Sequence, residues 1–272
     1  MSGNFIKMHG LGNDFVVIDA RIDAVAMTSA RARAIADRHT GIGCDQLILI
    51  EPSTTADVKM RIWNADGGEV SACGNATRCV AQLIGGAASI ETLGGTLRAS
   101  SEGALVSVAF PAPIFDAAAI PLAYAMDTAA MPVAWEGLPD GAAAPMAVNV
   151  GNPHIVFFVA DVDAVDLETL GPIIEHDPLF PERINVNVAS ITGDASLRLR
   201  VWERGCGETR ACGTGAVASA VCAIASRRCA SPLTVALPGG DLLIDWAGSG
   251  SATMYGPASE VYRGTTDWAN FG

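Results

Sequence analysis

Short stretches in which hydrophobic and polar residues alternate recur along the chain, and they are rich in β-branched and aromatic side chains. This pattern is typical of strands with one buried face. Five stretches fit it best, namely residues 59–64, 104–110, 154–159, 197–203 and 241–246. In three others, apolar residues stand three and four positions apart, which predicts helices over residues 29–38, 75–84 and 214–228. The mixture predicts an α+β fold.

Two parts of the sequence repeat each other. MRIWNADGGEVSACGN (residues 60–75) aligns with LRVWERGCGETRACGT (residues 199–214), so that Cys73 falls on Cys212, 139 positions further on. The same offset places Gly12-Asn13 on Gly151-Asn152 and Gln46 on Asn185. One register over three separate segments predicts two homologous lobes related by a pseudo-twofold axis, with the site in the cleft between them.

The boundary between the lobes is expected in residues 111–145, which are rich in Ala and Pro and show little periodicity. The N-terminal lobe is predicted to cover residues 1–115 and to carry Cys73. The C-terminal lobe is predicted to cover residues 116–257 and to carry Cys212. Residues 258–272 are a candidate for packing back on the first lobe.

Composition and charge exclude some classes of protein and some kinds of binding partner. Half of the 272 residues are hydrophobic and 17% are charged, which is typical of a globular protein with a large core. Seventeen basic residues against 29 acidic ones give a net charge of −12, and the basic ones are scattered, so neither nucleic acid nor an anionic membrane is an expected partner. The sequence offers neither a leader pattern nor a long apolar run, and its seven cysteines are an odd number without a CxxC motif. We therefore expect a soluble cytoplasmic protein with reduced thiols.

The repeated cysteines suggest acid–base chemistry. In both copies Cys-Gly opens an Ala-rich helical stretch, and the positive end of a helix dipole lowers the pKa of a thiol placed there. The backbone N–H groups of the same first turns, at Gly74-Asn75 and Gly213-Thr214, can hold a carboxylate. A thiol on each side of an adjacent α-carbon could remove a proton from one face and return one to the other, which inverts the stereocentre.

This chemistry is expected to need no cofactor. Pyridoxal phosphate requires a Schiff-base lysine, and the only two lysines, Lys7 and Lys59, lie in strand-like runs without a phosphate-binding loop nearby. The four histidines show no metal-ligand spacing, so no metal is predicted either.

Other candidates have a plainer interpretation as well. Cys79, Cys222 and Cys229 fit buried core positions better than catalytic ones, and the same holds for Cys44 and Cys206. His154 could be an ordinary core histidine, but it follows Asn152-Pro153 closely. The asparagines at 13, 64, 152 and 185 could be turn residues, although three of them occupy paired positions of the repeat, which favours ligand binding.

Several motifs together resemble the diaminopimelate epimerase family. They are MHGLGNDF (8–15), GIGCDQ (41–46), WNADG leading into ACGNATRC (72–79), GNPH (151–154), ERIN (182–185) and ERGCGETRACGTGA (203–216). The resemblance implies interconversion of LL- and meso-diaminopimelate, on the route to lysine and to peptidoglycan precursors, by two cysteines without a cofactor. It also implies two lobes, each a mixed sheet wrapped around a central helix, and a homodimer.

Residue by residue, the resemblance implies that Cys73 and Cys212 are the acid–base pair. Gly74-Asn75 and Gly213-Thr214 would hold the reacting carboxylate. Glu203 would contact the reacting ammonium group and, with His154, tune the thiols, while Arg204 would clamp the distal carboxylate. The remaining polar groups of this amino-acid substrate would be bound by Asn13, Gln46, Asn64, Asn152 and Asn185. Ala76 stands where the family often has Gly.

Three alternatives remain. A proline-racemase-like enzyme shares the two-cysteine plan, although His is expected there at the position of Asn75 and Asp near Glu203-Arg204. A cysteine hydrolase would use one thiol with His154 and form an acyl intermediate. A non-catalytic amino-acid-binding protein would need neither cysteine.

Overall fold

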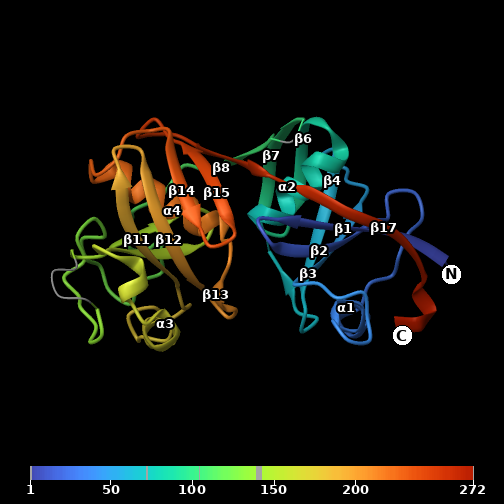
Figure 1. Ribbon diagram of the computed structural model, residues 1–272, viewed down its shortest axis with the longest axis horizontal. Coiled ribbons are helices and arrows are strands. Elements are labelled where there is room, and N and C mark those ends of the chain that lie inside the picture. Colours follow the sequence, from blue (N-terminus) through green and yellow to red (C-terminus); the bar gives the residue numbers. More distant parts are fainter. Residues whose placement is uncertain (1, 72, 104, 139–142, 272) are drawn as a thin grey trace. The chain divides into compact units, whose positions relative to one another are not determined.

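A computed structural model describes residues 2–71, 73–103, 105–138 and 143–271 (Figure 1). Ala72 of the first ACG motif and Ala104 of one predicted strand lie outside the described residues, as do four residues of the segment 111–145. The chain divides into two compact units, one formed by Met1–Val108 with Gly256–Gly272 and the other by Ala109–Tyr255. A compact unit need not be an independent domain, so the predicted division at 115/116 stays a prediction.

The first unit is a sheet packed around a helix. Helix α2 (Gly74–Ile84) is buried from Gly74 through Ala81, so it is enclosed around most of its circumference. The sheet order is β17-β1-β2-β3-β4-β6-β7, with β2–β3 and β4–β6 parallel and the short β5 paired to β4. The strands are β1 (Ser2–Gly10), β2 (Asn13–Asp19), β3 (Gln46–Glu51), β4 (Val58–Asn64), β5 (Glu69–Val70), β6 (Gly86–Thr92), β7 (Gly95–Glu102) and β17 (Ser259–Asp267), and helix α1 spans Ser29–Ala36. The 3-10 helix η2 (Trp268–Phe271) follows β17.

The second unit repeats this plan. Its central helix α4 (Gly213–Ala225) is buried over nearly all of its length. The strands that follow one another by pairing are β9 (Met146–Asn149), β10 (Pro153–Phe158), β11 (Asn185–Gly193), β12 (Ser196–Glu203), β14 (Leu233–Leu237), β15 (Gly240–Asp245) and β16 (Ala252–Pro257), with β13 (Gly207–Thr209) on β12. Helix α3 spans Leu167–Glu175, the 3-10 helix η1 spans Val162–Ala164, and β8 spans Leu105–Phe110 at the change from one unit to the other.

The strand registers of the two units coincide at the offset of the sequence repeat. Phe15 pairs with Gln46 in parallel strands, and His154 pairs with Asn185 in the same way. The neighbouring antiparallel pairs agree too: Leu47 faces Trp63 as Val186 faces Trp202, and Trp63 faces Glu69 as Trp202 faces Glu208. The α+β class and the two-lobed fold are thus confirmed.

The predicted elements are found with small shifts of their ends. Helices α1, α2 and α4 correspond to the three predicted ones, although α4 ends at Ala225 rather than at Arg228. The five predicted strands correspond to β4, β8, β10, β12 and β15. Helix α3 was not predicted, because Pro172 interrupts its pattern. The repeat offset carries α1 onto α3, so it was the signal that could have found this helix.

Candidate active site

In the first unit, sheet pairing brings three predicted polar residues to one end of neighbouring strands. Asn13 begins β2, Gln46 begins β3 beside it, and Asn64 ends the antiparallel β4. Gln46 pairs with Asn64 in the register, and its Nε2 donates to Asn64 Oδ1 at 2.9 Å. Residues that are far apart in the sequence therefore share one edge of the sheet.

Cys73 lies at the same edge as the N-cap of α2. Its backbone is extended, with φ of −148°, and its half-buried thiol lies 3.9 Å from Asn13 Oδ1. The buried Asn75, in the first turn of the helix, donates from Nδ2 to the same Asn13 Oδ1 at 3.1 Å. Asn13, Gln46, Asn64, Cys73, Gly74 and Asn75 form what we call the first-unit cluster.

Charged residues hold Asn13 in place. Asp45 Oδ2 accepts from Asn13 Nδ2 at 3.0 Å, and Arg38 donates to both Asp14 and Asp45 at 2.6 Å. Lys7 also pairs with Asp14. Burial raises the pKa of the Asp14 carboxyl, but hydrogen bonds from Arg38 and Lys7 outweigh it and bring the pKa to about 2. The network ties the MHGLGNDF motif to the GIGCDQ motif.

In the second unit, Cys212 is the N-cap of α4 and is buried. Its sulfur accepts from the backbone N–H of Gly215 at 3.4 Å and lies 3.5 Å from Thr214 Oγ1. Asn152 Nδ2 donates to Thr214 Oγ1 at 3.4 Å. The predicted residues Asn152, His154, Asn185, Glu203, Arg204, Cys212, Gly213 and Thr214 form what we call the second-unit cluster.

His154 is completely buried between two amides. Its Nε2 donates to Asn152 Oδ1 at 2.9 Å, and its Nδ1 accepts from Asn187 Nδ2 at 3.1 Å. Because a protonated ring could only donate at Nδ1, this second bond requires the neutral ring. Burial lowers the pKa of His154 to about 3. His154 therefore fixes the orientation of Asn152 and reaches Cys212 through Asn152 and Thr214. Asn187 was not predicted.

The expectation that the helix terminus lowers the pKa of the thiol is wrong for Cys212. Burial raises its pKa well above the usual value, and the Glu203 carboxyl, in hydrogen-bond contact with the thiol, raises it further. Burial also raises the pKa of Glu203, whose Oε1 accepts from Thr209 Oγ1. Desolvation and a neighbouring carboxyl outweigh the helix dipole here, so Cys212 is protonated at neutral pH.

Arg204 is exposed on the loop after β12. Its backbone N–H donates to Asn185 Oδ1 at 3.0 Å, and its Nη1 donates to the Glu182 carbonyl at 2.9 Å. The buried Glu175 of α3 anchors this loop, because its carboxylate accepts from Trp202 Nε1 at 2.7 Å and from the Gly205 N–H at 2.9 Å. Sequence reasoning missed Glu175, since a single carboxylate in a helix gives no local signal.

Four of the other cysteines are buried, as their plainer interpretation predicts, whereas for Cys206 a buried core position is wrong because it lies on the exposed loop before β13. Cys44 and Cys79 are buried, and burial raises the pKa of each thiol to about 12. Cys222 is buried in α4, and burial raises its pKa too. Cys229 is buried beside a shallow hollow of about 380 Å³ at the C-terminal end of α4, and Cys206 is exposed.

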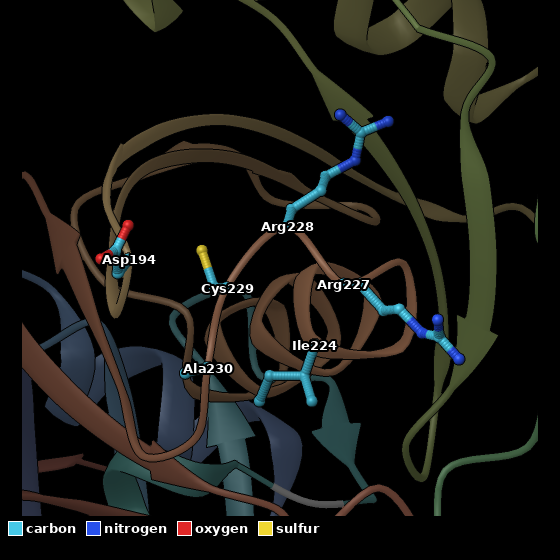
Figure 2. A pocket seen from close by; sticks show the side chains of 6 residues that line it. All are labelled: Asp194, Ile224, Arg227, Arg228, Cys229 and Ala230. Carbon is cyan, nitrogen blue, oxygen red and sulfur yellow. The ribbon is translucent and has the colours of Figure 1, made fainter.

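That hollow contains no predicted site residue. Figure 2 shows that Arg227 and Arg228 point away from each other there. The Arg228 guanidinium lies 4.8 Å from the Phe158 ring centre. No polar groups converge in it, so it makes no candidate site.

Within the described ranges, no three His, Cys, Asp or Glu side chains are grouped so that they could hold a metal ion. Among the described helices, none is long and apolar enough to cross a membrane.

Comparison with known proteins gives consistent results. The profile of the family described as "Diaminopimelate epimerase" matches residues 5–106 and 146–261. A diaminopimelate epimerase from Sphingopyxis alaskensis is 65% identical over all of both chains. One from Rhizorhabdus wittichii is 63% identical over all of this chain and 98% of its own.

Among solved structures, two share the fold at low identity. A phenazine biosynthesis protein of the PhzF family from Enterococcus faecalis has a TM-score of 0.72 at 15% identity, over 98% of this chain and all of its own. A probable proline racemase from Agrobacterium radiobacter has a TM-score of 0.67 at 15% identity, over 97% of this chain and 92% of its own. At this identity the likeness concerns the fold alone.

Proposed function

The chain belongs to the diaminopimelate epimerase family, and from this premise we propose how its residues invert the α-carbon of diaminopimelate. The chain is an isomerase that interconverts LL- and meso-diaminopimelate, a step of lysine and peptidoglycan precursor biosynthesis. In the proposed scheme the first-unit and second-unit clusters act on one substrate molecule. A cytoplasmic location remains a prediction of the sequence pattern, and a homodimer remains a prediction of the family resemblance.

The observation that carries the scheme is the equivalent position of two thiols. Cys73 and Cys212 are the N-caps of the two central helices, at matching positions of the repeat. The substrate α-carboxylate binds the first-turn N–H groups at Gly74-Asn75 and Gly213-Thr214, where the helix dipoles favour an anion. One thiol then faces each side of the α-carbon.

Inversion is a pair of proton transfers. A thiolate at Cys73 takes the α-proton and becomes a thiol, and the electron pair delocalises into the carboxylate as an ene-diolate stabilised by the helix N–H groups. The Cys212 thiol then gives its proton to the opposite face and becomes a thiolate. The raised pKa of Cys212 supports this direction, because it keeps the proton on that sulfur before substrate binds. The reverse reaction exchanges the two roles.

The remaining predicted residues bind the substrate in this scheme. Glu203 contacts the reacting ammonium group, and the Arg204 guanidinium holds the distal carboxylate in a planar, bidentate contact. The amide side chains of Asn13, Gln46, Asn64, Asn152 and Asn185 bind other polar groups, with Asn152 oriented by the neutral His154.

The test uses LL-diaminopimelate in deuterated water. We expect one deuterium at the inverted α-carbon with the intact chain, and no detectable inversion by Cys73→Ala or Cys212→Ala, because each variant lacks one of the two proton carriers. Folding of the variants is checked by circular dichroism. Near-normal inversion by either variant would contradict the two-thiol scheme. Proline serves as a control substrate, and comparable turnover of proline would favour the proline-racemase-like alternative.

A further inference from the structure

At one buried position, α2 has a charged side chain where α4 has an apolar one. Arg78 of α2 is completely buried, and the residue at the matching position of α4 is the equally buried Val217. Burying a guanidinium is unfavourable unless hydrogen bonds compensate for the lost water. Helix α4 is a central helix with an apolar residue at this position, so packing of a central helix does not require a cation there. We therefore expect Arg78 to have a specific role in the first unit.

The contacts of Arg78 lead directly to the first-unit cluster. Its Nη2 donates to Asn75 Oδ1 at 2.9 Å, and its Nε donates to the Pro257 carbonyl at 3.1 Å. Strand β1 leaves room for the guanidinium at Gly10, where an added Cβ would lie 3.0 Å from Arg78 Nη2. The side chain is therefore held at several points and cannot turn freely.

Arg78 begins a chain of hydrogen bonds with a fixed direction. Asn75 accepts from Arg78 through Oδ1 and donates through Nδ2 to Asn13 Oδ1, and Asn13 donates through Nδ2 to Asp45 at 3.0 Å. A guanidinium only donates and a carboxylate only accepts, so these two ends settle which way both amides face. The chain places an amide oxygen, Asn13 Oδ1, against the Cys73 thiol at 3.9 Å.

We propose that Arg78 is a positioning residue for Cys73, which it acts on through Asn75 and Asn13. It orients both amides and thereby fixes the position of the reacting thiol relative to the first turn of α2. An electrostatic interaction between Arg78 and Cys73 supports this assignment. The catalytic consequence rests on the proposed function, in which Cys73 exchanges the α-proton.

The first experiment measures turnover of LL-diaminopimelate by the full-length chain. Arg78→Lys keeps the charge but loses the planar fork, so it cannot serve Asn75 and Pro257 together. Loss of a buried hydrogen bond from a charged group typically lowers an equilibrium or rate constant at least tenfold, so we expect kcat/KM to fall about tenfold or more. Ile35→Val is the control for lowered stability, since it removes one core methyl group in α1, and we expect its kcat/KM to stay within about twofold.

The second experiment reads Cys73 without substrate, by mass spectrometry after a timed reaction with iodoacetamide at pH 7. In Arg78→Met the nearby cation is absent, so we expect the alkylation rate of Cys73 to fall about tenfold relative to the exposed Cys206 in the same sample. Arg78→Lys retains the cation and should stay within about threefold of the wild type. A merely structural role would not produce this split between the two variants.

Asp45→Ala tests the other end of the chain at an exposed residue, where folding is expected to survive. It frees Asn13 Nδ2, and we expect kcat/KM to fall about fivefold. The proposal is overturned if kcat/KM of Arg78→Lys stays within about threefold of the wild type, or if Cys73 alkylation is unchanged in Arg78→Met. If the Arg78 variants do not fold, Asp45→Ala decides, and an unchanged kcat/KM of that variant overturns the proposal. If the wild-type chain does not invert diaminopimelate at all, the proposed function fails, while the alkylation result still decides the link between Arg78 and Cys73.

Discussion

His154 shows how much a single buried side chain depends on its partners. The neutral ring joins Asn187 to Asn152 and, through Thr214, supports the surroundings of Cys212. No solvent reaches the ring, so a protonated form would be charged in an apolar interior and would lose its acceptor contact with Asn187. The surroundings of His154 therefore stabilise only its neutral form.

This gives a prediction for stability against pH. The pKa of His154 is about 3 in the folded chain and about 6.5 in an unfolded one, so the unfolded state takes up the proton first as the pH falls. The contribution is fully present above pH 6.5 and is lost on the way to pH 3. Between pH 7 and pH 5 we expect the free energy of unfolding to fall by about 2 kcal/mol from this group.

Urea unfolding at both pH values, for the wild type and His154→Gln, measures that contribution. The variant should lack about 2 kcal/mol of the pH-dependent loss, even if it is less stable at pH 7. Asp14 does not interfere, because its lowered pKa acts only below about pH 4. Equal pH dependence in both proteins would mean that His154 is not held neutral.

At the scale of elements, the first turn of each central helix differs at its third residue. In α4 this residue is Gly215, where an added Cβ would lie 2.7 Å from Asn187 Oδ1, 3.0 Å from Val201 Cγ2 and 3.3 Å from Cys212 Cβ. In α2 it is Ala76, which is buried in the structure, and the position matching Asn187 is Ile48. An alanine at this position of the helix therefore fits in α2, whereas in α4 it would collide with Asn187.

We predict that Gly215→Ala damages the second unit. The new methyl group must displace Asn187 or the N-cap Cys212, so we expect a loss of about 1–3 kcal/mol in unfolding free energy and a fall in kcat of at least about tenfold. Thermal unfolding and steady-state kinetics measure the two effects. Ala76→Gly is the matched control in α2, and it should cost only about 1 kcal/mol of helix propensity. Full activity of Gly215→Ala would show that the contact with Asn187 relaxes easily.

The sequence predicts the elements and the site to different degrees. Strands such as β4 and β12 alternate along their length and were found, whereas β17 is exposed at most positions and gives no such pattern. Asn13, Gln46 and Cys73 were identified as candidates because the repeat pairs them with residues of the second unit. Arg78, Asn187 and Glu175 were not, because they are buried and reach the two clusters through side-chain hydrogen bonds that no sequence motif indicates.

At the scale of the whole molecule, the last residues of the chain complete the unit that contains the first ones. Strand β17 pairs with β1 from Ser2↔Asp267 to His9↔Ser259, as Figure 1 shows near the two termini. Trp268 then enters the core of that unit, close to Gly3, where an added Cβ would lie 1.9 Å from the indole nitrogen. Stability of the first unit therefore depends on residues at both ends of the sequence.

We predict that Trp268→Ala lowers the free energy of unfolding by about 3–5 kcal/mol, because it leaves a cavity in the core between β1 and α1. Val261→Ala on the exposed part of β17 is the control, with an expected change within about 0.5 kcal/mol. Denaturant unfolding of both variants decides the point. A small effect of Trp268→Ala would mean that the C-terminal segment contributes little to this unit.

The register shared by the two units also duplicates one ion pair. Arg61 contacts Glu69 at 2.7 and 2.9 Å, and Arg200 contacts Glu208 with the same two distances between the same atoms. Only the surroundings differ, since Arg61 stacks on Trp63 whereas Arg200 also donates to two backbone carbonyls. The chain thus contains the same Arg–Glu ion pair twice, once in each unit. Replacing the pair in one unit and then in the other would show how the surroundings alone change the contribution of one ion pair to stability, because the two side chains and their geometry are the same.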